Sequence, residues 1–225
     1  MATVTLIRGA ELVAAPWKNG GGITREVAAG FAKGPASAGS PSAKLDAFVW
    51  RVSIADVAQA GPFSRFEGIA RTLVLLSGAG MVLDETGAPE YGSSASDVRV
   101  VKSHVLKQPF DIARFDGEAR IDARLIDGAT RDFNLMVRRD AAHGELDVWH
   151  GEARQQRART FSSDVTLLFC ADGAVTLTPG GAQPLSLDTG DTLRIDSPNA
   201  LSCALEGAGA VLAIQIRYTS TTAQQ

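Results

Sequence analysis

Arginines and small polar side chains with aromatic neighbours recur along this 225-residue chain, and one such segment is FVWRVSIADV (48–57). Strand periodicity of two residues places Arg51 and Ser53 on one side of a strand. If that side faces the interior of a β-barrel, the two side chains form a donor pair suited to a carboxylate. If it faces water, Arg51 is a solvated charge.

Two further segments concentrate residues of the same kinds. GPFSRFEGIARTL (61–73) contains two phenylalanines together with Arg65, Glu67 and Arg71. LIDGATRDFNLMVRR (125–139) contains the polar and charged residues Asp127, Arg131, Asp132 and Asn134. Such arginines can bind an anionic ligand or form internal ion pairs with aspartates, and the sequence leaves both readings open.

The segment PWKNGGGITRE (16–26) raises the question of a phosphate-binding loop. Its glycines fit neither G-x-x-x-x-G-K-[ST] nor G-x-G-x-x-G, and no strand-loop-helix pattern follows. Consecutive glycines allow positive φ angles and close approach of another strand or a ligand. We therefore interpret Trp17, Asn19 and Thr24 as part of a pocket rim, to which Gly20–Gly22 give backbone donors or clearance.

Signatures of covalent or metal catalysis are missing from the sequence. No G-x-S-x-G motif occurs, and neither Cys170 nor Cys203 has a basic neighbour that would favour a thiolate. Both cysteines lie in apolar, strand-like segments, which indicates buried free thiols in a reducing compartment. The prediction is a protein without a cofactor.

Composition limits the class of protein and its partners. Apolar residues make up 45% of the chain, charged residues 21%, and the formal net charge is −3. These values are typical of a globular domain and predict no binding to nucleic acid or anionic lipid. The N-terminus lacks the pattern of a secretory signal, and no apolar run is long enough for a membrane helix. We expect a cytoplasmic protein, and the sequence leaves a homodimer open.

Short runs of β-branched and apolar residues between Gly, Pro, Asp and Ser clusters predict an all-β fold. The expected strands are 3–8, 23–29, 47–54, 71–77, 79–84, 98–106, 109–114, 119–125, 132–139, 145–150, 164–170, 174–178, 184–187, 192–195, 200–205 and 210–218. A single helical turn is expected near 9–13 or 54–58. Residues 30–46, 84–97 and 151–163 read as loops. So many short strands indicate a sandwich or jelly roll.

A weak internal repeat supports a duplicated jelly roll. RTLVLLSGAGMVLDE (71–85) is similar to DVTLLFCADGAVTLTP (164–179), and FDIARFDGEARI (110–121) is similar to LSLDTGDTLRI (185–195). The same order in both halves predicts duplication of one unit. Chance similarity between hairpins is the alternative.

The segment LSLDTGDTLRID resembles the turn that opens the second half of a cupin barrel, so the metal-binding pattern of cupin enzymes can be laid on the chain. Arg71, seven residues before Gly78, takes the place of the metal-binding glutamate. Ser64, Phe66 and Cys203 take the places of histidines. Replacing a carboxylate by arginine would convert a cation site into an anion site, so no metal site is predicted.

Five motifs in order are similar to the HutD/Ves family: PWKNGGGITRE, FVWRVSIADV, GPFSRFEGIARTLVLLSGAGM, FDGE and DGATRDFNLMVRR. The similarity extends over residues 5–218. It implies a bicupin, with two RmlC-like cupin jelly-roll barrels in one chain. It also implies an association with histidine utilisation, in which family members resemble regulators rather than pathway enzymes. We expect barrels at 1–130 and 131–225, packed as one compact unit.

The resemblance and the residues together favour a non-enzymatic protein that binds a small carboxylate and limits histidine utilisation. The implied ligand is a pathway intermediate such as urocanate, formiminoglutamate or formylglutamate. The predicted binding residues are Trp17, Asn19, Gly21, Thr24, Trp50, Arg51, Ser53, Ser64, Phe66, Arg71 and Asn134. One alternative is a metal-independent enzyme with Glu26, Asp116 and Asp132 as acids and bases. Another is a protein-interaction module with a vestigial pocket.

Overall fold

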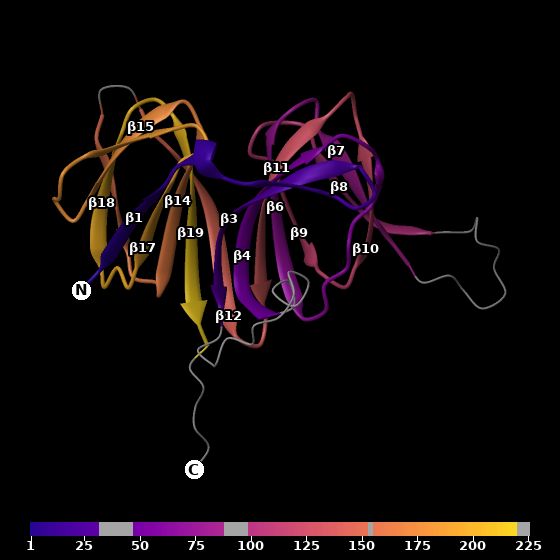
Figure 1. Cartoon of the computed structure of the whole chain (residues 1–225), viewed down its shortest axis with the longest axis horizontal. Helices are drawn as coiled ribbons and strands as arrows, with labels where there is room; N and C mark the ends of the chain where they lie inside the picture. The colour runs from indigo at the N-terminus through magenta and orange to yellow at the C-terminus, as the bar shows by residue number, and fades with distance from the viewer. Residues whose placement is uncertain (32–46, 88–98, 153–154, 220–225) are drawn as a thin grey trace, which may run out of the picture. The chain divides into compact units, whose positions relative to one another are not determined.

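The computed structural model describes residues 1–31, 47–87, 99–152 and 155–219. The chain divides into two compact units. The N-terminal unit is Val13–Arg139, and the C-terminal unit combines Met1–Leu12 with Asp140–Gln225. Both units are built mainly from strands within the described ranges (Figure 1), and a short 3-10 turn is present at Gly9–Glu11. No helix within those ranges has the length and hydropathy needed to cross a membrane.

The N-terminal unit contains two antiparallel sheets. The six-stranded sheet has the order β2-β3-β4-β11-β6-β9, and the four-stranded sheet has the order β5-β10-β7-β8. The strands of the larger sheet are β2 (Ala14–Pro16), β3 (Gly22–Phe31), β4 (Phe48–Val57), β6 (Ile69–Ser77), β9 (Ile112–Asp116) and β11 (Thr130–Arg138). Those of the smaller sheet are β5 (Gly61–Pro62), β7 (Met81–Thr86), β8 (Val100–Leu106) and β10 (Arg120–Leu125).

The C-terminal unit repeats this arrangement with a five-stranded and a four-stranded sheet. Their orders are β1-β17-β14-β19-β12 and β13-β18-β15-β16. The larger sheet contains β1 (Thr3–Ile7), β12 (Ala142–His150), β14 (Val165–Asp172), β17 (Thr192–Asp196) and β19 (Ala210–Tyr218). The smaller sheet contains β13 (Arg157–Phe161), β15 (Ala174–Pro179), β16 (Leu185–Asp188) and β18 (Leu201–Glu206).

Strands β4–β11 and β12–β19 pair in the same way. Adding eight to each strand number of the first set turns its pairings, such as β4 with β11 and β6 with β9, into those of the second set. This topology shows two copies of one eight-stranded jelly roll, the bicupin fold that the sequence predicts. The first predicted repeat, 71–85 with 164–179, is confirmed, because it pairs β6-β7 with the topologically equivalent β14-β15. The second is displaced by one strand, because β9 corresponds to β17 and not to β16.

The division between the units differs from the expected boundary between residues 130 and 131. That boundary falls at the start of β11, which pairs with β4 and β6 and so belongs to the first copy. The N-terminal strand β1 pairs with β17 and so belongs to the C-terminal unit. For both β1 and β11, pairing with strands distant in sequence decides to which unit the strand belongs.

Every expected strand has a counterpart in the structure, and the differences are local. Strands β2, β5 and β13 were not expected, and β13 lies inside the expected loop 151–163. The expected helical turn is the 3-10 turn at Gly9–Glu11, whereas residues 54–57 belong to β4. The expected loop 30–46 begins within β3 and its residues 32–46 lie outside the described ranges. In the expected loop 84–97, residues 84–86 belong to β7 and residues 88–97 also lie outside those ranges.

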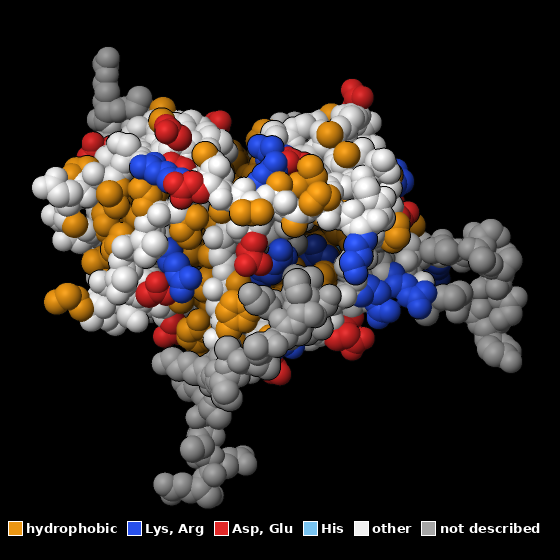
Figure 2. All heavy atoms as spheres, viewed as in Figure 1, with side chains coloured by type: hydrophobic (Ala, Val, Ile, Leu, Met, Phe, Trp, Pro, Cys, Tyr) orange, Lys and Arg blue, Asp and Glu red, His pale blue; other side chains and the backbone are white. Residues whose placement is uncertain are grey.

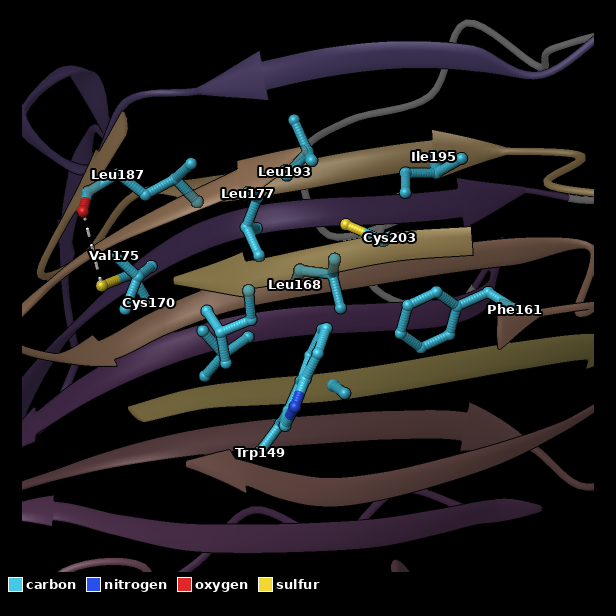
Figure 3. Packing of buried hydrophobic residues seen from close by; sticks show 13 residues of the cluster. Trp149, Phe161, Leu168, Cys170, Val175, Leu177, Leu187, Leu193, Ile195 and Cys203 are labelled. Atoms are coloured by element: carbon cyan, nitrogen blue, oxygen red, sulfur yellow. Dashed lines mark hydrogen bonds between the residues drawn. The ribbon is translucent and has the colours of Figure 1, made fainter. Parts of the chain in front are cut away.

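The interior of the C-terminal unit is filled by apolar side chains (Figure 3). Trp149 and Phe161 meet edge to face with ring centroids 6.1 Å apart, and Leu168, Cys170 and Cys203 are fully buried around them. Burial raises the pKa of each of the two thiols to about 11, so both stay protonated at neutral pH. Close apolar packing of this kind is the main stabilising contribution to such a barrel.

Candidate functional site

The interior of the N-terminal unit contains polar side chains beside its apolar core. Its six-stranded sheet turns Leu73 and Leu75 of β6 towards the core cluster that also includes Leu83 of the smaller sheet. Residues directly opposite each other on neighbouring strands share a face. By that rule the inner face also carries five buried polar residues: Ser53, Arg71, Thr130, Asp132 and Asn134. Thr130 donates its hydroxyl hydrogen to the carbonyl of Gly80 over 3.2 Å. The other four are here called the polar cluster.

Arg71 lies near three aromatic rings. Its side chain is 7% exposed, and its guanidinium carbon is 5.1 Å from the ring centroid of Phe115, 5.4 Å from that of Phe63 and 5.7 Å from that of Phe66. One long hydrogen bond of 3.4 Å runs from Nη1 to the carbonyl of Ser64, and Nε has no hydrogen-bond partner among the residues that the structure describes. Burial lowers the pKa of Arg71 to about 10, so it remains a cation at neutral pH.

Asp132 and Asn134 provide buried acceptors on the same face. Within the described part of the chain, Asp132 Oδ2 and Asn134 Oδ1 have no hydrogen-bond partner. Burial raises the pKa of Asp132 to about 7, with Arg71 opposing the shift and Asp56 adding to it. A buried polar atom without a partner costs about 1–3 kcal/mol, so a bound molecule that satisfies it gains affinity. The buried atoms of the cluster without a partner among the described residues are therefore one donor and two acceptors.

Two other polar pairs lie on the inner face next to the cluster. Arg51 Nε donates to Glu26 Oε2 over 2.7 Å, so the charge of Arg51 is compensated within the chain. Trp17 Nε1 donates to Thr24 Oγ1 over 2.7 Å, and its ring meets Phe63 edge to face at 6.4 Å. Arg51 is therefore inward-facing, as one of the two sequence readings expects, and is ion-paired within the chain.

The glycine-rich segment forms a tight turn before β3. Asn19 Oδ1 accepts the backbone N–H of Gly21 over 3.0 Å, and Gly20 has a φ of 70°. A Cβ at Gly22 would lie 2.6 Å from the carbonyl oxygen of Asp56 and 3.2 Å from the Trp17 ring. The close approach of β4 and the seating of Trp17 therefore require glycine at this position.

The loop between β5 and β6 holds phenylalanines against Arg71. Glu118, in the turn after β9, accepts the backbone N–H of Gly68 over 2.8 Å and forms an ion pair with Arg139. These contacts lower the pKa of Glu118 to about 2, the hydrogen bond from Arg139 contributing most. The backbone N–H of Phe66 donates to the carbonyl of Gly117, and Arg65 Nε donates to the carbonyl of Glu118 over 2.8 Å, so three hydrogen bonds tie this loop to the turn.

The structure brings some of the predicted binding residues together and separates others. Thr24, Arg51, Ser53, Arg71 and Asn134 share the inner face, with Trp17 and Phe66 adjoining it. Trp50 is fully buried but alternates with Arg51 and Ser53, so it lies on the opposite face of β4. Asn19 is exposed and closes the glycine turn with Gly21, and exposed Ser64 meets Arg71 through its carbonyl group.

Other residues of the site were not among the predicted binding residues. Asp132 was expected as an acid or base and not as a binding residue, although it lies two residues before Asn134 on one strand. Phe63 and Phe115 are joined to Arg71 by long-range pairing that local patterns do not reveal. His104, on the inner face of β8, has a tilted ring contact with Phe115 at 5.9 Å and a buried Nε2 without a partner.

The residues that take the places of cupin metal ligands in the sequence comparison do not all lie in one unit. Arg71 lies in the N-terminal unit and Cys203 in the C-terminal unit. Among the residues that the structure describes, no three His, Cys, Asp or Glu side chains group closely enough to hold a metal ion. The donor set around Arg71 instead has the chemistry of an anion site.

Acidic and basic side chains are interspersed on the face shown in Figure 2. Among the surface ion pairs, Arg131 and Arg25 both contact Asp56 over 2.6 Å. Pairs of this kind neutralise charge locally. The buried cation of Arg71, by contrast, has no carboxylate within ion-pairing distance among the described residues.

Comparison with known proteins gives a consistent result. The family model described as HutD matches residues 9–213. The chain is 33% identical over 201 residues to an uncharacterised 21.2 kDa protein in the hutC 3′ region of Pseudomonas putida, covering 89% of this chain and 91% of that protein. It is 32% identical over 192 residues to protein Ves of Citrobacter koseri, covering 81% and 82% of the two chains.

Solved structures agree with these sequence relatives. HutD from Pseudomonas fluorescens SBW25, solved in a formate condition, is similar with a TM-score of 0.73 and 28% identity, over 97% of this chain and 100% of that chain. Lactobacillus farciminis oxalate decarboxylase, in a formate complex, has a TM-score of 0.55 at 7% identity, over 95% and 85% of the two chains. At that identity the similarity concerns the cupin fold alone.

Proposed function

Because the chain belongs to the HutD/Ves family, we propose that it is a non-enzymatic protein that binds a small carboxylate and thereby regulates histidine utilisation. The family associates the chain with histidine utilisation. The candidate ligands are the pathway intermediates urocanate, formiminoglutamate and formylglutamate. Binding inside the N-terminal barrel would change its stability or partner contacts and so set the level of the pathway.

The buried cation of Arg71 is the observation that carries this proposal. Burying a charge without a partner is costly, and the three nearby phenylalanine rings only partly compensate a guanidinium. A carboxylate bound to Arg71 would supply the missing charge through strong, charge-assisted hydrogen bonds. The unpartnered Nε is one donor available for that contact.

Calorimetry with the three intermediates tests the proposal. We expect at least one to bind to the wild-type protein with sub-millimolar affinity, and Arg71→Ala to weaken binding at least tenfold. Arg217→Ala is the matched control, because Arg217 forms a half-exposed pair with Glu145 in the other unit. Absence of binding by all three acids at millimolar concentration would refute the proposal.

Asp132 supports a second candidate, a metal-independent enzyme that acts on such an intermediate. A buried carboxyl group with a pKa of about 7 has the property that general acid-base catalysis needs near neutral pH. The other two candidate carboxylates are engaged elsewhere, Glu26 with Arg51 and Asp116 with Arg139. Turnover of an intermediate by metal-free protein, abolished by Asp132→Asn, would favour this candidate; an unchanged substrate would exclude it.

A further inference from the structure

We propose that the ligand is a monocarboxylate with a basic N–H group, such as an imidazole, whose carboxylate contacts Arg71 and whose N–H is accepted by Asp132 and Asn134. This inference rests on the proposed function and narrows it. It divides the three candidate acids, because urocanate has one carboxylate and an imidazole ring whereas the other two have two carboxylates.

The polar cluster is ordered by charge along the strands. Arg71 lies opposite Met136 of β11, Asn134 lies two residues further along β11, and Asp132 a further two. A strand rises about 3.3 Å per residue, so the rows of Arg71 and Asp132 are about 13 Å apart at the backbone. The long arginine side chain can span part of that distance. The inner face thus has a cationic end, a neutral middle and a carboxyl end, which fits a ligand with two unlike ends.

The atoms without partners have matching polarity. Arginine only donates hydrogen bonds, and an ionised carboxylate only accepts them. The unpartnered atom at the cationic end is the donor Arg71 Nε, and those further along are the acceptors Asn134 Oδ1 and Asp132 Oδ2. A molecule with acceptors alone would satisfy Arg71 and leave both acceptors buried without a partner, which is unfavourable.

The charge balance disfavours a second carboxylate. Arg51, the other arginine of the same row, is paired with Glu26. Arg71 is therefore the one cation of that row left without a carboxylate contact. A dicarboxylate would bring its second anionic group towards two acceptor atoms, and the ionised form of Asp132 would repel that group in a buried environment.

The sharpest test compares ligands of nearly the same shape. Urocanate, 3-(2-furyl)acrylate and N-formylglutamate would each be titrated into the wild-type protein by calorimetry at pH 7. Furylacrylate keeps the carboxylate and a flat five-membered ring but lacks the N–H. We expect urocanate to bind at least tenfold more tightly than either of the other acids, which equals about 1.4 kcal/mol.

Variants of the acceptor end locate the source of that preference. Asp132→Val introduces the residue at the equivalent position of the C-terminal barrel, Val211, and should reduce the preference for urocanate over furylacrylate to below threefold. Asn134→Ala, which introduces the equivalent of Ala213, should reduce it partly. Asp132→Asn provides the same test with a nearly isosteric side chain if the valine variant does not fold.

The outcomes separate this inference from the proposed function. Equal affinity for urocanate and furylacrylate, or tighter binding of formylglutamate, would overturn the inference while leaving carboxylate binding intact. A preference for urocanate that survives both Asp132 variants would also overturn it. If none of the three acids binds, the proposed function fails together with the inference.

Discussion

The two barrels have the same strand pairing but different interiors. The β6–β11 and β14–β19 pairs each contain one register irregularity. Beside it lies the pair Leu75–Asp132 in the first barrel and the pair Cys170–Val211 in the second, so these two pairs are equivalent. Counting along the strands from there gives the equivalent inner-face residues. Arg71, Asp132 and Asn134 of the N-terminal unit correspond to Thr166, Val211 and Ala213 of the C-terminal unit.

This difference in side chains gives the C-terminal interior a structural role and makes the N-terminal interior the candidate binding site. In the C-terminal unit, Trp149 lies opposite Val211, and its indole packs in the apolar core. The equivalent pair in the N-terminal unit is Ala55 opposite Asp132, where a methyl group replaces the indole. The inner face of one copy is thus filled by apolar side chains, whereas that of the other keeps polar atoms without a partner among the described residues, which reduce its stability. Retention of a destabilising feature in one copy is typical of a functional site.

Trp149→Ala should give the largest change and tests the structural role of the C-terminal interior. Trp149 is 2% exposed, and its removal leaves a cavity, so we expect the free energy of unfolding to fall by about 3–5 kcal/mol. Urea denaturation followed by circular dichroism measures the loss. Trp149→Phe should cost less because it fills part of the cavity. A loss below about 1 kcal/mol for the alanine variant would show that the two interiors do not differ in packing as described.

Asp132→Asn should change the pH dependence of stability. The pKa of Asp132 is about 7 in the folded protein, against an ordinary aspartate value of 3.8 that applies to the unfolded chain, so the folded state binds the proton more tightly. Wild-type stability should fall as pH rises from about 4 to about 7, and the asparagine variant should lack this component. The difference approaches an upper limit of about 4 kcal/mol in favour of the variant above pH 7.

Chemical denaturation at pH 4, 6 and 8 measures this difference. The converse variant is Val211→Asp, which places an acid in the apolar barrel where Thr166 replaces the arginine. It should destabilise the protein more at pH 8 than at pH 4. Parallel pH profiles of wild type and Asp132→Asn would contradict the burial of an ionisable group in the N-terminal interior.

Alternating residues and turn-forming clusters were sufficient to predict the fold class and most strands. Strands β2, β5 and β13 were not predicted, because AAP and GP are too short to show alternation and RARTF is largely polar. The boundary between the barrels was misplaced by one strand. Membership of β1 and β11 depends on hydrogen bonds to distant strands, and local propensity contains no information about such pairing.

The candidate site could be predicted in part. Period-two spacing correctly put Arg51 and Ser53 on one face, but only pairing with β11 shows that the face is internal. The same periodicity places Trp50 on the opposite face. The prediction of Trp50 as a binding residue rests on its aromatic side chain and does not fit this geometry. The contacts of Phe63 and Phe115 with Arg71 could not be foreseen because they join separate strands and loops.

Glu118→Gln should weaken the contacts that hold the β5–β6 loop, and with it Phe63 and Phe66, beside Arg71 in the N-terminal barrel. The low pKa of Glu118 means that its contacts stabilise the protein above about pH 4.5, and that this stabilisation is lost as pH falls towards 2. Because Glu118 is partly exposed, we expect a loss of about 1 kcal/mol at pH 7. Thermal unfolding measures it, with the exposed Glu67→Gln as control. Equal melting temperatures for both variants would contradict this role.

Glu26→Gln should have the smallest effect on stability. It tests a position that carries an arginine in the N-terminal barrel and a glutamate in the C-terminal barrel. Arg51, paired with Glu26, corresponds in register to Glu145, which lies 3.6 Å from Arg217. The glutamate of each pair is half-exposed, so either Glu26→Gln or the matched Glu145→Gln should cost less than about 1 kcal/mol. Only Glu26→Gln releases an arginine on the inner face beside Arg71, so only this variant should bind N-formylglutamate more tightly, by at least threefold in calorimetry. If Glu145→Gln had the same effect on affinity, the gain would come from net charge, and the inner face of the N-terminal barrel would not be its source.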